Sequence, residues 1–146
     1  MNYRNLFFMT ILSFISMYIL MYMMVDSFAN VYSNLNQFYM AGIMTAPMVI
    51  IELLLMGSMY HNKKLNTFII LLSFSLGMLL IFFLRKQTAI SDKEFLKSMI
   101  PHHGAAILMC EQASIQDPEI EKLCKNIVSG QQSEIDFMKA KLETIK

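Results

Sequence analysis

The run that decides the fold is Leu6–Val25, LFFMTILSFISMYILMYMMV, which holds twenty residues without a charged side chain. About 20 apolar residues are enough for a helix to cross the hydrocarbon core of a bilayer. A secretory signal is the competing interpretation, because Ser27-Phe28-Ala29 has the small-residue spacing of a cleavage site. The apolar part of a signal peptide is only about 7 to 15 residues long, so we expect a retained membrane helix.

Two further apolar runs follow, at residues 38–60 and 67–84, and they complete a predicted membrane domain of three helices over residues 1–86. The second run carries Glu52 near its middle. A charged residue there costs about 2.5–3.5 kcal/mol on insertion, so Glu52 is expected to face the other helices. It either bonds a Ser or Tyr hydroxyl in its protonated form or lends an oxygen to an ion path.

The distribution of basic residues predicts the orientation of these helices. Arg4 precedes the first run and Lys63-Lys64 lie in the second loop, whereas residues 26–37 contain no Lys or Arg. Lys and Arg concentrate in cytoplasmic loops, which predicts a cytoplasmic N-terminus and an extracytoplasmic C-terminal part in a bacterial inner membrane. Two basic residues directly after the third run count against this orientation.

Candidate metal ligands gather in the C-terminal part, in the stretch Met99-Ile-Pro-His-His-Gly-Ala-Ala-Ile-Leu-Met-Cys110. Imidazole, thioether and thiol groups are the ligands that bind soft or borderline metals such as copper. Ser91 and Glu94 form a capping box, so a helix is expected from Ser91 that tolerates a kink at Pro101. On it His102 and Met109 share one stripe, and Met99, His103 and Cys110 share the next. The alternative is ordinary core packing.

A second helix is expected from the cap Asp117 and from Pro118 to about residue 145, which makes residues 87–146 a helical hairpin. In it Cys110 lies level with Cys124, as a disulfide or as a soft-metal site, and Met138 comes within reach of Met99 or His102. Its inward face collects Ile120, Leu123, Cys124, Ile127, Gln131, Glu134, Ile135, Met138 and Leu142, of which Gln131 and Glu134 need polar partners. Two helices bury little surface, so we expect a homo-oligomer that completes a four-helix bundle.

Methionine is concentrated in the first two apolar runs, whereas the third contains only Met78. Met44 and Met48 share a helix face with Glu52, and together with methionines of the first run they could form a thioether path for Cu(I). The spacing of Met40, Met44 and Met48 is similar to the paired methionines of eukaryotic copper channels. The alternative is flexible apolar packing, which Met performs well.

Several classes of function find no support in the sequence. The formal net charge is only +1, and residues 85–146 carry nine basic and nine acidic side chains, so nucleic acid is not an expected partner. There is no Glu-x-x-His motif of di-iron enzymes, no Gly-rich phosphate loop and no Cys-x-x-Cys pair. We therefore do not expect an enzyme.

Three motifs, at residues 99–109, 117–120 and 131–138, resemble the ferritin-like family catalogued as domain of unknown function 305. The Met- and Tyr-rich runs look like those of its membrane-anchored members. The resemblance implies a helical hairpin or four-helix domain, often extracytoplasmic and linked in several members to the binding of copper or silver and to copper tolerance. By this analogy the candidate ligands are His102, His103, Met109 and Met138.

The sequence thus predicts an all-α, membrane-anchored protein that binds Cu(I) or Ag(I) in metal homeostasis or resistance. The full set of predicted metal ligands is Met99, His102, His103, Met109, Cys110, Cys124 and Met138 in the hairpin, with Met44 and Met48 in the membrane. Two alternatives are a Cu(I) transporter that uses the Met-rich helices and an accessory membrane subunit without a metal.

Overall fold

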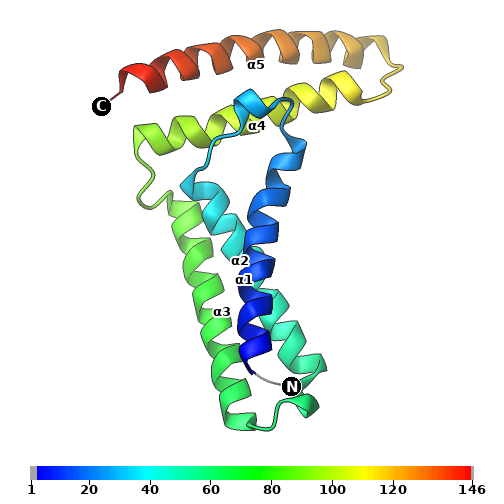
Figure 1. Ribbon diagram of the computed structural model, residues 1–146. Coiled ribbons are helices and arrows are strands. Elements are labelled where there is room, and N and C mark those ends of the chain that lie inside the picture. Colours follow the sequence, from blue (N-terminus) through cyan, green and yellow to red (C-terminus); the bar gives the residue numbers. More distant parts are fainter. Residues whose placement is uncertain (1–2, 146) are drawn as a thin grey trace. The chain divides into compact units, whose positions relative to one another are not determined.

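The computed structural model describes residues 3–145, and within that range the protein is helical and contains no strand (Figure 1). The helices are α1 (Tyr3–Leu20), α2 (Leu35–Leu55), α3 (Lys63–Lys86), α4 (Asp92–Gln112) and α5 (Pro118–Thr144). They form two compact units. The first unit comprises the chain up to Met21 together with Asn36–Ala89, and the second comprises Tyr22–Leu35 and the chain from Ile90 onward.

Three helical segments of the chain are long and apolar enough to cross a membrane, as the sequence predicts: Tyr3–Met24, Leu35–Leu55 and Lys63–Lys86. The second span ends at Leu55 instead of the predicted residue 60. The chain turns there through a short 3₁₀ helix, Gly57–Met59, because glycine is a poor helix former. The third span begins earlier than predicted, because the side chain of Asn62 caps it by accepting a hydrogen bond from the Leu65 amide.

Within the first unit, small residues and one polar contact set the helix packing. A Cβ added at Gly77 of α3 would lie 3.2 Å from the Ala46 Cβ of α2, so these two helices approach closely through small residues. The carboxylate of Glu52 accepts a hydrogen bond of 3.2 Å from the hydroxyl of Tyr60, a partner of the expected type. Burial, followed by the hydrogen bond to Glu52, raises the pKa of Tyr60 above its ordinary value.

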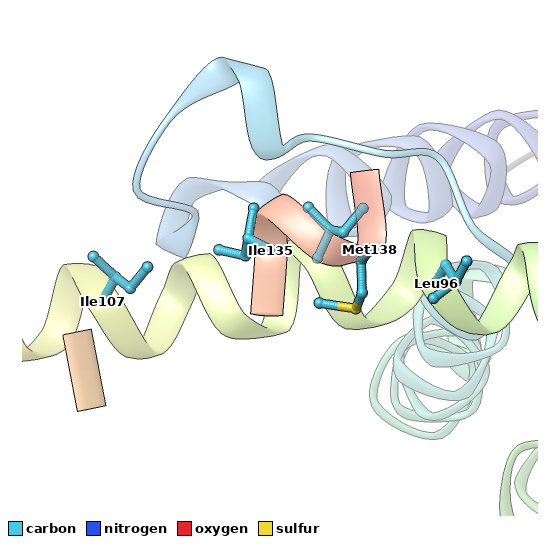
Figure 2. Packing of buried hydrophobic residues seen from close by; sticks show 5 residues of the cluster. Leu96, Ile107, Ile135 and Met138 are labelled. Carbon is cyan, nitrogen blue, oxygen red and sulfur yellow. The ribbon is translucent and has the colours of Figure 1, made fainter. Parts of the chain in front are cut away.

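The second unit is built on α4 and α5, which lie side by side and run in opposite directions (Figure 1). Both begin where the sequence predicts: the Ser91 side chain caps α4, and the Asp117 side chain accepts hydrogen bonds from two amides at the start of α5. Their shared core, shown in Figure 2, consists of Leu96, Ile100, Ile107, Ile135 and Met138. The helix pair therefore owes its packing to a stripe of apolar residues on each helix.

Two apolar positions of the predicted inward face of α5 are exposed instead. The side chains of Ile120 and Leu123 are 50% and 55% exposed. Cys110 and Cys124 are bonded to each other only two residues before α4 ends at Gln112. Most of the part of α5 that precedes Cys124 therefore extends beyond the end of α4 and has no partner helix to pack against. The prediction was wrong at Ile120 and Leu123 because the spacing of apolar residues along one helix does not show where its partner helix ends.

The segment Tyr22–Leu35, which joins α1 to α2, folds with α4 and α5, whereas the sequence analysis placed it in the membrane domain. Tyr32 packs against the core of the helix pair, and Asn30 and Asn34 are buried. We call this segment the first loop. The second unit thus consists of two helices and a loop that is distant in sequence.

Candidate metal centre

His103 is a buried side chain of α4 whose two ring nitrogens are both hydrogen-bonded. Nδ1 lies 2.8 Å from the carbonyl oxygen of Met99, and Nε2 lies 2.7 Å from Oε2 of Glu134 on α5. A carbonyl oxygen only accepts a hydrogen bond, so Nδ1 is the ring nitrogen that donates to Met99. Glu134, one of the two polar exceptions on α5, therefore has a partner, and His103 joins the two helices.

His102 lies on a different face of α4 and is exposed to solvent. Its ring stands 6.0 Å from the ring of His103, edge to face. Met99, one turn earlier, is half-buried, and Met109, two turns later, is 53% exposed. The stretch from Ser98 to Cys110 contains no Asp, Glu, Lys or Arg side chain, so this accessible imidazole lies in an uncharged part of the α4 sequence.

The remaining predicted ligands of the second unit have structural partners. Met138 is only 6% exposed and packs in the core shared by α4 and α5. Cys110 and Cys124 form a disulfide, which decides between the two alternatives left open by the sequence. No cluster of three or more His, Cys, Asp or Glu side chains suited to a metal ion occurs within residues 3–145.

In the first unit, the methionines of α1 and α2 meet at the surface. Met9, Met17 and Met48 line a hollow of about 500 Å³ together with polar side chains that include Ser13 and Ser16. Met44, in contrast, is 38% exposed and does not line this hollow. The structure therefore brings Met48 together with two methionines of α1, neither of which was among the predicted ligands.

The first loop contacts α4 at the point where Pro101 interrupts the helix. Proline has no N–H, so the carbonyl of Lys97 loses its usual partner within the helix. The side-chain amide of Asn34 donates a hydrogen bond to that carbonyl at 3.4 Å and another to the carbonyl of Tyr32 at 2.9 Å. The proline in the sequence indicates that a donor from outside the helix is needed, but not which one.

The first loop also approaches the backbone of α4 closely at Gly104, next to the histidine pair. A Cβ at this position would overlap Oδ1 of Asp26 and would lie 3.3 Å from Val25 Cγ1. Both carboxylate oxygens of Asp26 accept hydrogen bonds from the side-chain amide of Asn30, at 2.8 and 2.9 Å. A glycine inside a helix is a signal of close approach, although the sequence does not name the partner.

Glu94 joins the start of α4 to the start of α2. Its Oε2 accepts a hydrogen bond of 2.9 Å from the Leu35 amide, and its Oε1 accepts one of 3.0 Å from Lys97 Nζ. Partial burial raises the pKa of this carboxyl, but the hydrogen bonds from Lys97 and Leu35 and the charge of Lys97 outweigh burial and hold the pKa below its ordinary value. Sequence analysis assigned Glu94 only to the capping box.

Comparison with known proteins finds two matches. Residues 83–142 match the family described as a domain of unknown function, DUF305. An uncharacterised protein of Acanthamoeba polyphaga mimivirus is 31% identical over 149 aligned residues, which cover all of this chain and 96% of the viral protein. No solved structure matches the chain.

Proposed function

We propose that this chain, which belongs to the same family as the uncharacterised mimivirus protein and matches DUF305 in its C-terminal part, is a membrane-anchored protein that binds Cu(I), or Ag(I), in metal homeostasis or resistance. The proposal places the three apolar helices in the membrane and the metal site on α4, outside the cytoplasm.

The observation that carries this proposal is the exposed face of α4. His102 offers an accessible imidazole, whereas both ring nitrogens of His103 are hydrogen-bonded. Side chains one turn apart on a helix are neighbours, so the thioether of Met99 is within reach of a metal held by His102. Imidazole and thioether ligands together suit a copper ion that is captured and passed on.

A complete site needs more ligands than this face supplies. Met109 is exposed two turns beyond His102 and is available to a second molecule. We propose that two copies pair through α4 in a ferritin-like arrangement of four helices, in which Met109 of each copy approaches His102 of the other. The exposed apolar side chain of Phe95 lies on the same side of α4 and would be covered by this pairing.

A second candidate function is transport of Cu(I) through the membrane. The observation that favours it is the hollow between α1 and α2 that Met9, Met17 and Met48 line. Thioethers bind Cu(I), and a row of them within a membrane would offer the ion successive ligands. In this alternative the second unit would be a structural attachment, and its histidines would not bind the metal.

The test uses the full-length protein in detergent micelles with its disulfide intact. Cu(I) is kept reduced by ascorbate and is titrated in competition with the chelator bicinchoninate. We expect His102→Ala to remove at least one high-affinity equivalent. The control His61→Ala replaces the third histidine, which is exposed in the loop after α2, and should leave binding unchanged.

Substitutions in the membrane separate the two candidates. Met48→Leu should leave the affinity unchanged if α4 holds the metal, and should abolish binding and uptake into proteoliposomes if the methionine hollow does. A wild-type protein that binds no Cu(I) in either assay would refute both candidates and leave the accessory structural role, which fits the partners of His103 and Met138.

A further inference from the structure

The disulfide between Cys110 and Cys124 is accessible from solvent. Both cysteines are half-buried, and neither belongs to the core shared by α4 and α5. Both line an open hollow of about 510 Å³ where α4 ends and α5 begins. Thiol–disulfide exchange requires a thiolate to reach one of the two sulfurs, so the position of this bond permits attack by a reductant.

One of the charged residues that line the hollow, Lys125, favours a thiolate once the bond opens. Lys125 follows Cys124 directly and lines the same hollow, where its Nζ lies 2.6 Å from Oε1 of Glu121. A nearby lysine stabilises a cysteine thiolate, which is the form of cysteine that binds metals. The hollow therefore combines two sulfur atoms with one lysine and with the carboxylates of Glu111 and Glu121.

Contacts other than the disulfide hold the two helices together. Ile107 and Ile135 are almost completely buried between them, and His103 bonds Glu134 across the pair. Reduction should therefore leave the two cysteines facing each other. Their Cα atoms are 5.2 Å apart, so rotation about the side-chain bonds suffices to place both sulfurs on one small ion.

We propose that Cys110 and Cys124 form a second metal site that reduction opens, in which two thiolates bind one Cu(I). A reducing dithiol gives two electrons and two protons to the disulfide, so the dithiol becomes a disulfide and the protein gains two thiols. Binding of one Cu(I) by both sulfurs then releases two protons. Thiolate ligands select Cu(I), so the site would open under reducing conditions and close when the cysteines are oxidised again.

This inference takes its metal from the proposed function but concerns a different part of α4, so the two fail separately. The full-length protein is reduced with dithiothreitol, freed of it without oxygen, and titrated with Cu(I) against bicinchoninate beside the oxidised protein. We expect the reduced protein to bind one equivalent of Cu(I) more than the oxidised protein, with an ultraviolet Cu(I)–thiolate absorption band. The affinity of the reduced protein for Cu(I) should be at least tenfold higher than that of the oxidised protein.

Two controls assign the additional equivalent to the cysteines. Cys110→Ser/Cys124→Ser should lack it under both conditions, and so should reduced wild-type protein alkylated with iodoacetamide, which keeps the inference testable if the double variant does not fold. His102→Ala should keep it, because that substitution affects only the site proposed above. Equal stoichiometry of reduced and oxidised protein would overturn the inference, as would a disulfide that dithiothreitol reduces only after unfolding.

Discussion

The close approach of the first loop to α4 predicts that one substitution has the opposite sign to the usual rule. Replacing a helical glycine by alanine normally stabilises a protein by about 1 kcal/mol. Gly104→Ala should instead destabilise the second unit, because the new Cβ would overlap Oδ1 of Asp26. Either Asp26 stays and the site is overpacked, or it moves and Asn30, which is 3% exposed, loses its partner.

Both outcomes have a comparable cost. Overpacking costs about 1–3 kcal/mol, and an unsatisfied buried polar group costs a similar amount. Oδ1 of Asn30 is already a buried atom without a hydrogen-bond partner among the described residues, so the loss of Asp26 would leave both ends of this amide without their hydrogen bonds. Taking about 2–3 kcal/mol for the cost and subtracting about 1 kcal/mol of helix propensity leaves a net loss of about 1–2 kcal/mol.

Hydrogen exchange of the backbone amides, followed by mass spectrometry in detergent micelles, measures this loss. A destabilisation of about 1–2 kcal/mol should lower the protection of residues 96–107 and of the first loop by about 5–30-fold. Gly130→Ala is the matched control, because nothing lies within 4 Å of a Cβ at this position of α5, and it should raise protection. If Gly104→Ala also raised protection, the close contact with Asp26 would be refuted.

Two further predictions concern the contacts of the first loop, Tyr22–Leu35, with α4. The pKa of Glu94 is lowered in the folded protein, so its contribution to the free energy of unfolding is full above the ordinary carboxyl range and is lost as the pH falls through the lowered value. Glu94→Gln should lower the free energy of unfolding by about 1 kcal/mol at neutral pH. In thermal melts it should also remove this part of the pH dependence of stability. A variant whose stability falls with acid as steeply as that of the wild type would contradict the role of the carboxylate. Asn34→Ala should cost about 1 kcal/mol because the Lys97 carbonyl loses its donor, but clearly less in a Pro101→Ala background, where the restored N–H at position 101 serves that carbonyl. Equal costs in the two backgrounds, measured by urea unfolding, would show that the proline is not the reason for this contact.

The limits of the sequence are clearest at the candidate site. Adjacent histidines beside methionine indicate soft-metal chemistry, and the helix period places His102 and His103 on different stripes of α4. The sequence does not show that one of the two imidazoles is bonded to Glu134, thirty-one residues away, while the other is exposed. That difference depends on which face of α4 meets α5, and so on long-range packing.

The sequence by itself determined the features that depend on neighbouring residues. Apolar length predicted three possible membrane spans, and the caps at Ser91 and Asp117 fixed the starts of α4 and α5, because these patterns act within a few turns of one helix. Only the tertiary structure decided that Cys110 and Cys124 are joined and that the first loop, some seventy residues earlier in the chain, belongs beside α4. Such contacts arise from the burial of surfaces between distant segments, and no local periodicity records which surfaces meet.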